Sequence, residues 1–200
     1  MSCAAAAAEQ QLKGILGYTE APNVSSDFNH DWAWRWTPTP EDRLVTQTTP
    51  SPRPTAPTAL PAAAAPAWPA FRGPNRDSIL RGGPQIATNW ASTPPTELWR
   101  HPVGPGWSSF AVSGDVFYTQ EQRGEEELVS CYRLATGEPV WRHHDATRFW
   151  ESNAGPGPRG TPTIDGKRLY ALSRWGDLFC FELTDGKIIW QKNVQKETGA

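Results

Sequence analysis

One pattern occurs twice in this sequence, as Cys131-Tyr-Arg-Leu-Ala-Thr-Gly-Glu-Pro-Val-Trp141 and as Cys180-Phe-Glu-Leu-Thr-Asp-Gly-Lys-Ile-Ile-Trp190. The two copies align without a gap, and equivalent residues, such as Trp141 and Trp190, are 49 positions apart. In each copy a Gly stands between two apolar runs, where it can supply the positive φ of a tight hairpin. The pattern therefore predicts two equivalent β-hairpins.

A second repeated pattern precedes the first. The segments Val112–Tyr118 and Ile164–Tyr170 each carry a central Gly and a final Tyr, and Gly114 and Gly166 are 52 positions apart. The difference between the two spacings falls in Gln120–Glu127, whose acids and Gly predict an exposed loop. A period of about 50 residues with short β-prone runs is typical of β-propellers, in which each unit is a four-stranded blade.

The predicted fold is therefore all-β, a partial β-propeller of about two to three four-stranded blades. Leu98-Trp99-Arg100 matches the end of each unit, and Leu178–Leu183 is apolar on both faces, as expected for a strand that neighbouring blades cover. A propeller closes with about four to eight blades. We therefore expect the remaining blades to come from a longer chain.

Three regions are expected along the chain. Residues 1–45 form an N-terminal tail, residues 46–67 a linker, and residues 68–200 the incomplete propeller domain. Pro, Ala and Thr dominate the linker, which removes amide donors and offers no large side chains to bury. The linker is predicted to be extended and disordered.

The tail is expected to be disordered except for a short strand and a short helix. Trp32, Trp34 and Trp36 alternate as on one face of a strand. This stripe is either an anchor to upstream structure or a strand that pairs with a sheet edge. Further on, Thr39 is a good helix cap with Pro40 at the first helical position.

Composition excludes several classes of protein. The net charge of −2 gives no electrostatic case for binding nucleic acid or anionic lipid. The three cysteines, Cys3, Cys131 and Cys180, are an odd number without CxxC spacing, which argues against a disulfide framework and a structural zinc site. No apolar run approaches the roughly 20 residues of a transmembrane helix, and the N-terminus has no convincing signal peptide.

These repeats resemble the PQQ-like (quinoprotein-type) β-propeller family, whose unit ends in a pattern like Leu-x-x-x-Thr-Gly-Lys-x-x-Trp. Both copies follow it, with Glu138 and Asp185 as departures. The resemblance implies that the Trp of each unit docks between adjacent blades. The structural repeat residues are therefore expected to be Gly137, Trp141, Gly186 and Trp190. Little of a third unit follows Trp190, so we expect Trp190 to be less covered than Trp141.

Two further segments, Trp68–Asn75 and Gly106–Ala111, are similar to the opening of envelope-associated, non-catalytic members of this family. The resemblance implies a bacterial protein of the cell envelope or periplasm. Enzymes in the broad family bind the quinone PQQ with calcium, using adjacent cysteines, acidic calcium ligands and a Trp platform. This sequence has no adjacent Cys pair, so we expect no cofactor, no metal and no catalytic residue in it.

Cys131 and Cys180 occupy equivalent positions in successive blades. Packed sheets lie about 10 Å apart, whereas a disulfide needs Cα atoms within about 7 Å. We expect both to be small buried side chains that do not bond to each other.

Two polar runs could suggest a metal site. Adjacent residues of a strand point in opposite directions, so His143-His144-Asp145 is not expected to share one metal. Glu125-Glu126-Glu127 is expected to be solvated in its loop.

The connection from Arg148 to Gly160 is the candidate ligand loop, because loops on rigid scaffolds often bind ligands. Its candidate residues are Arg148, Trp150, Glu151 and Arg159. In the alternative interpretation, Trp150 only covers the neighbouring blade. Trp107 and Ser108 are expected to begin a strand in the corresponding connection one blade earlier.

The sequence favours a non-catalytic scaffold that presents inter-blade loops to a protein or glycan partner. The alternative is a remnant of a PQQ-dependent alcohol or sugar dehydrogenase. The dehydrogenase requires calcium ligands and a quinone platform, and the scaffold does not.

Overall fold

The computed structural model describes residues 18–24, 30–34, 36–46, 68–83, 85–152 and 154–199, the first two of these ranges by their backbone alone. Residues 47–67 of the predicted linker lie outside the described residues, as do the side chains of Trp32 and Trp34.

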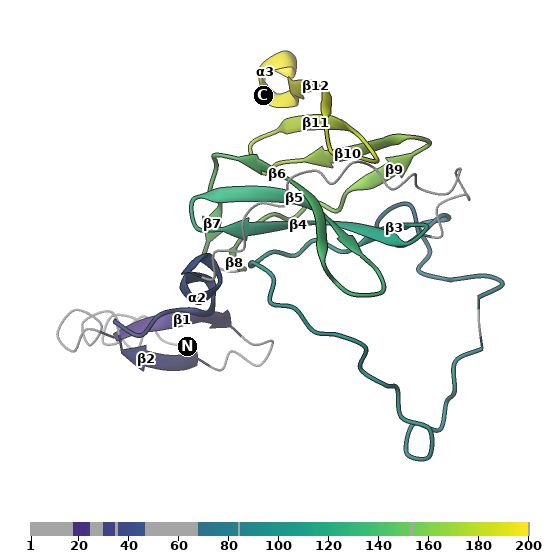
Figure 1. The fold of residues 1–200 in the computed structure, drawn as a ribbon. Coiled ribbons are helices and arrows are strands. Elements are labelled where there is room, and N and C mark those ends of the chain that lie inside the picture. The colour runs from purple at the N-terminus through teal and green to yellow at the C-terminus, as the bar shows by residue number, and fades with distance from the viewer. Residues whose placement is uncertain are drawn as a thin grey trace.

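Two four-stranded antiparallel sheets, stacked face to face, form the centre of the molecule (Figure 1). The first contains β3 (Ala111–Ser113), β4 (Val116–Arg123), β5 (Glu126–Arg133) and β6 (Pro139–Asp145). The second contains β9 (Thr163–Asp165), β10 (Arg168–Leu172), β11 (Asp177–Glu182) and β12 (Ile188–Asn193). In both sheets the strands pair in chain order, as in a propeller blade. The predicted partial propeller is confirmed, with two blades.

The glycines of the repeat lie in the turns where the sequence places them. Gly114 and Gly166, with φ of 60° and 57°, turn the first hairpin of each blade. Gly137 and Gly186, with φ of 71° and 69°, turn the last hairpin. L-residues with a side chain rarely adopt this conformation, so the turns specify glycine.

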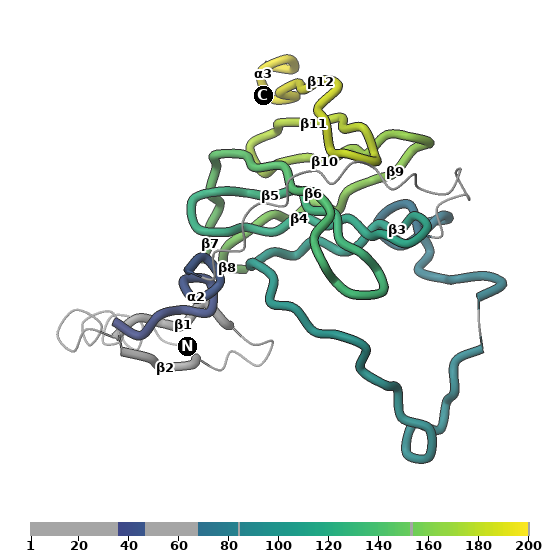
Figure 2. The backbone as a smooth tube through the Cα atoms, viewed as in Figure 1, coloured from purple at the N-terminus to yellow at the C-terminus, as the bar shows by residue number. Residues whose placement is uncertain are grey.

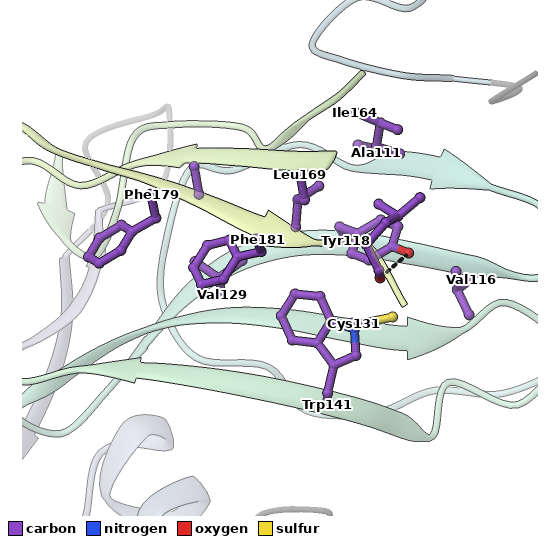
Figure 3. Close-up of a cluster of buried hydrophobic side chains, with 12 residues drawn as sticks. Ala111, Val116, Tyr118, Val129, Cys131, Trp141, Ile164, Leu169, Phe179 and Phe181 are labelled. Atoms are coloured by element: carbon purple, nitrogen blue, oxygen red, sulfur yellow. Dashed lines mark hydrogen bonds between the residues drawn. The ribbon is translucent and has the colours of Figure 1, made fainter. Parts of the chain in front are cut away.

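The main hydrophobic core lies between the two blades. Trp141 of β6 is 2% exposed, and its ring centroid lies 5.8 Å from that of Tyr118 and 6.0 Å from that of Phe181 on the second blade. Figure 3 shows these side chains converging between the strands. The Tyr118 hydroxyl donates to the carbonyl oxygen of Leu183 at 3.1 Å, which adds a polar link between the blades. Cys131 and Cys180 are free and buried, as expected.

Trp141 and Trp99 each rest on the turn Gly of the following unit. A Cβ atom added to Gly186 would lie 2.5 Å from the Trp141 ring, and one added to Gly137 would lie 2.5 Å from the Trp99 ring. Trp99 thus packs against the first blade in the same way that Trp141 packs against the second blade. Trp190, the next Trp in this series, is 37% exposed, in agreement with the expected asymmetry.

The prediction of an exposed loop over Gln120–Glu127 is wrong. β4 and β5 continue through this segment, and only Gly124 and Glu125 form the turn. Glu121, at 1% exposed, is buried because its carboxylate finds partners. Glu121 accepts hydrogen bonds from the Gly104 amide at 2.7 Å, from Ser130 at 2.9 Å and from the Tyr132 hydroxyl, and pairs with Arg123 at 3.0 Å.

Shorter elements surround the blades. β1 (Tyr18–Val24) pairs with β2 (His30–Trp34), so the predicted strand ends before Trp36. α2 (Pro40–Thr46) begins where predicted: the Asp42 amide donates to the Thr39 hydroxyl at 3.0 Å and the Thr39 amide to the Asp42 carboxylate at 2.8 Å. Two-residue strands β7 (Trp150–Glu151) and β8 (Gly155–Pro156) pair with each other, and α3 (Val194–Thr198) follows β12. Among the described residues, no helix is long and apolar enough to cross a membrane.

Candidate functional site

The connection between the blades crosses the end of the first sheet at which β4 turns into β5. Figure 2 follows the chain from β6 through β7 and β8 to β9. The Trp107 amide donates to the Pro158 carbonyl oxygen at 2.9 Å, and the Ser109 amide to the Thr161 hydroxyl at 2.9 Å. The connection is therefore fixed to the segment that leads into β3.

This pairing corrects the expectation that Trp107 and Ser108 begin a strand. The strand begins at Ala111, because the Trp107 amide bonds to the neighbouring connection and not to β4. The Trp107 indole N–H donates to the Ala154 carbonyl oxygen at 2.9 Å, which places its exposed ring beside the connection.

Arg148, the first candidate residue, is held by the N-terminal helix. Its guanidinium pairs with the Glu41 carboxylate of α2 at 3.0 Å and also donates to the Gly124 carbonyl oxygen. The structure thus joins a predicted ligand residue to an element 107 positions away in sequence.

Arg159 lies at the centre of the remaining candidates. It pairs with Glu151 at 2.9 Å and donates to the Gly155 carbonyl oxygen at 2.8 Å. Its guanidinium lies over the Trp107 ring at 5.7 Å and over the Phe149 ring at 5.2 Å from the centroids. Trp150 is exposed on the two-residue strand β7 and lies outside this stack.

The stack continues onto the second blade. The Arg174 guanidinium, in the turn between β10 and β11, lies 4.9 Å from the Phe149 centroid and 6.0 Å from that of Trp175. Rings and cations alternate across the blade boundary, an arrangement in which each guanidinium meets the negative face of a ring. We call this set the aromatic–arginine row; its members are Trp107, Arg159, Phe149, Arg174 and Trp175.

Sequence reasoning found Arg159 and named Trp107 but missed Phe149, Arg174 and Trp175 as members of the site. One signal was present: Trp107 and Arg159 are 52 positions apart, the spacing of the second repeated pattern, that of Gly114 and Gly166. They are therefore equivalent residues of successive units, and equivalent positions approach each other where blades stack. The turn that carries Arg174 had no such signal.

A polar cluster lies buried between the blades. Glu127 is only 4% exposed, which corrects the expectation of a solvated acid, and neither of its carboxylate oxygens has a hydrogen-bond partner in the described part of the chain. Gln120, His143 and Asp145 line a cavity of about 10 Å³ with it. Gln120 Oε1 and His143 Nε2 also have no described partner. A space of this size holds about one water molecule.

Burial sets the ionisation of this cluster. It raises the pKa of Glu127 to about 7, with a further contribution from Asp145; the nearby Arg174 backbone amide and the Arg159 charge partly oppose this rise. Burial likewise raises the pKa of Asp145, aided by Asp177, and lowers the pKa of His143, aided by His144. In each case the low-dielectric interior disfavours the charged form.

The two adjacent histidines diverge, as strand geometry requires. His143 packs against Phe179 and Phe181, with centroids 5.1 and 5.0 Å apart, whereas His144 faces outward and lies 2.8 Å from the Glu126 carboxylate. Within the described ranges, no group of three His, Cys, Asp or Glu side chains could hold a metal ion.

The sequence matches a family model described as "Outer membrane protein assembly factor BamB" over residues 125–200, from the β4–β5 turn onward. This match confirms the resemblance to PQQ-like repeats in that part of the chain. A short stretch of 26 residues is 77% identical to a glyceraldehyde-3-phosphate dehydrogenase from Xanthobacter flavus; it covers 13% of this chain and 8% of that protein.

Two solved structures are similar to part of the chain. BamB from Moraxella catarrhalis is 17% identical over 44% of this chain and 23% of its own, with a TM-score of 0.32. A europium-containing methanol dehydrogenase is 14% identical over 46% of this chain and 16% of its own, with a TM-score of 0.35. The chain spans less than a quarter of the length of each of these three proteins. The assignment of the two blades rests on their strand order and on the repeat.

Proposed function

We propose that the chain is a non-catalytic β-propeller repeat scaffold whose inter-blade connection binds a protein partner. The observation that carries this proposal is the aromatic–arginine row, which leaves Trp107 and Trp175 exposed on a rigid pair of blades. Rigid presentation favours binding because little conformational entropy is lost when the partner docks.

A protein partner fits the row better than a glycan. Trp and Arg are the residues most enriched in the energetic hot spots of protein interfaces, where large rings bury area and guanidinium groups pair with acceptors. Glu151 is joined to the row by its ion pair with Arg159, and Trp150 is exposed beside it on β7. The match to the BamB family model supports a proposed location of the scaffold in the bacterial cell envelope.

Site-specific photocrosslinking tests this function. A photoreactive phenylalanine analogue replaces Trp107 or Trp175 in turn, and a control replaces Leu134, which is exposed in the β5–β6 turn at the other end of the first blade. We expect the positions of the row to capture one common protein, the Leu134 position not to capture it, and Arg174→Ala to weaken capture. Equal capture at Leu134 would contradict the proposal.

The alternative, a remnant of a PQQ-dependent dehydrogenase, is tested by a separate experiment. It requires the chain to bind the quinone PQQ together with calcium. We expect no stoichiometric complex by calorimetry and no dye-linked alcohol oxidation. A complex of micromolar affinity or tighter would favour the enzyme remnant over the scaffold.

A further inference from the structure

The contact between α2 and the first blade shows which chemistry this end of the blade accepts. The Glu41 carboxylate lies 3.0 and 3.3 Å from two nitrogens of the Arg148 guanidinium. The same carboxylate accepts a hydrogen bond from the Gly124 amide at 3.0 Å. Two guanidinium donors and a backbone amide thus converge on one carboxylate, and charge-assisted bonds of this kind are strong and directional.

An apolar contact accompanies the charged one. Leu44, one helical turn beyond Glu41, is buried, and Val45 approaches the Gly124 backbone. Leu44 also forms part of the wall of a groove of about 450 Å³. The other residues that line the groove include His101, Arg123, Tyr132 and Arg142. An acid and a leucine three positions apart lie on one face of a helix, so α2 presents both to the blade at once.

We propose that this surface is a receptor for a short acidic helix, and that α2 occupies it as an internal ligand which a helix of the partner protein replaces. We define the α2 receptor by Gly124, Arg148 and the groove beside Leu44. This inference rests on the proposed scaffold function and specifies the partner: a protein segment that carries a carboxylate and, three residues later, a large aliphatic side chain on one helical face.

The size and the attachment of α2 make its displacement feasible. A helix of seven residues is marginal by itself in water, so the receptor and not the helix supplies most of its order. Residues 47–67 separate α2 from the first described residues of the blade domain. A tethered ligand of this kind competes at an effective concentration of about millimolar, which a tighter free partner overcomes.

The receptor can be tested with a labelled peptide of residues 37–47, TPTPEDRLVTQ, added to the full chain. In the variant Glu41→Gln/Leu44→Ala the internal helix loses both contacts and the receptor is free. We expect the peptide to bind this variant at least about tenfold more tightly than it binds the unaltered chain, measured by fluorescence anisotropy. A further Arg148→Ala change should weaken binding at least about tenfold.

Two controls separate the receptor from general charge effects. A peptide with Gln in place of Glu41 should lose the same affinity, and Arg168→Ala, which removes an ion pair with Glu182 on the second blade, should have no effect. Three outcomes would overturn the proposal. The peptide could bind equally well with and without Arg148, it could bind the Glu41→Gln/Leu44→Ala variant and the unaltered chain equally well, or it could fail to bind at millimolar concentration. Concentration-dependent dimers that Arg148→Ala abolishes would also overturn it, because a second copy would then be the occupant.

The peptide experiment and the crosslinking experiment fail independently. Trp107→Ala and Arg174→Ala alter the aromatic–arginine row and should leave peptide binding unchanged, since neither residue contacts α2. Failure of the peptide to bind, with capture at the row intact, would remove the acidic-helix partner and keep the scaffold function.

Discussion

Gly186 has no room for a side chain because the Trp141 ring lies where its Cβ would be. An added Cβ would lie 2.5 Å from that ring, and the residue has φ of 69°. We expect Gly186→Ala to lower the free energy of unfolding by about 2–4 kcal/mol, from overpacking and backbone strain together. Urea denaturation measures the loss.

Gly166→Ala is the matched control for that change. Gly166 also has positive φ, at 57°, but open space surrounds its Cβ position. Gly166→Ala should lower the free energy of unfolding by only about 1–2 kcal/mol, from backbone strain alone. Equal losses for the two variants would show that Trp141 does not rest on Gly186 in solution.

Glu127 makes the stability of the blade interface depend on pH. Its pKa is raised to about 7 in the folded chain, so between about pH 4.5 and pH 7 the folded state binds more protons than the unfolded state. The contribution of Glu127 to stability is therefore present in acid and is lost as the pH rises to about 7. Gln does not ionise. The free energy of unfolding of Glu127→Gln should therefore exceed that of the unaltered chain by up to about 3 kcal/mol as the pH rises across this range.

The difference between the two chains isolates Glu127 from its neighbours. His143, whose pKa is lowered, acts in the opposite direction, because its contribution is lost as the pH falls. Chemical denaturation at pH 4.5 and pH 7.5 measures both chains. A constant difference between them at both pH values would show that Glu127 titrates as an exposed acid.

At the scale of the elements, hairpins were predictable and polar strands were not. Gly137 and Gly186 allowed their turns to be predicted because a positive φ excludes most other residues. The segment Gln120–Glu127 has the composition of a loop, yet it is strand, because Glu121 and its partners satisfy one another's hydrogen bonds. Two of these partners, Ser130 and Tyr132, lie on β5, and no local sequence pattern reveals them.

The segment that carries Trp99 packs on the first blade without forming a regular strand. It has no strand partner in the described structure, but the Trp99 indole N–H donates to the Leu134 carbonyl oxygen at 3.0 Å and the ring covers Gly137. We expect Trp99→Ala to lower the free energy of unfolding by about 1–2 kcal/mol, less than a fully buried Trp, because the ring is only half-buried.

Leu98→Ala is the control for Trp99→Ala. Leu98 is exposed beside Trp99, and its loss should change stability by no more than about 0.5 kcal/mol. Equal effects of the two substitutions would show that Trp99 does not dock on the first blade.

For the whole molecule, sequence composition predicts one main boundary. Limited proteolysis should cut within residues 46–67 and leave a core that begins near Trp68, whose amide bonds to the Val112 carbonyl oxygen at 3.3 Å. Mass spectrometry identifies the core. A protease-resistant segment that includes Pro50–Pro66 would contradict this boundary.

Long-range contacts limited what could be predicted about the candidate site. Arg148, Trp150, Glu151 and Arg159 share one connection, so the sequence grouped them, whereas the structure separates Arg148 toward α2 and Arg159 toward the second blade. Arg174 joins Arg159 only because the blades stack, with Phe149 between the two cations. Stacking geometry of this kind is set by the fold and not by local composition.

The central claim is that the chain consists of consecutive blades, each docked to the next by its terminal Trp. Trp141 and Trp190 are equivalent in sequence, but Trp141 is 2% exposed and Trp190 is 37% exposed. The most direct measurement is the free energy of unfolding of Trp141→Ala and of Trp190→Ala in otherwise identical chains. We expect a loss of about 3–5 kcal/mol for Trp141→Ala and a much smaller loss for Trp190→Ala. Equal losses would contradict the claim, because they would mean that both rings are covered alike.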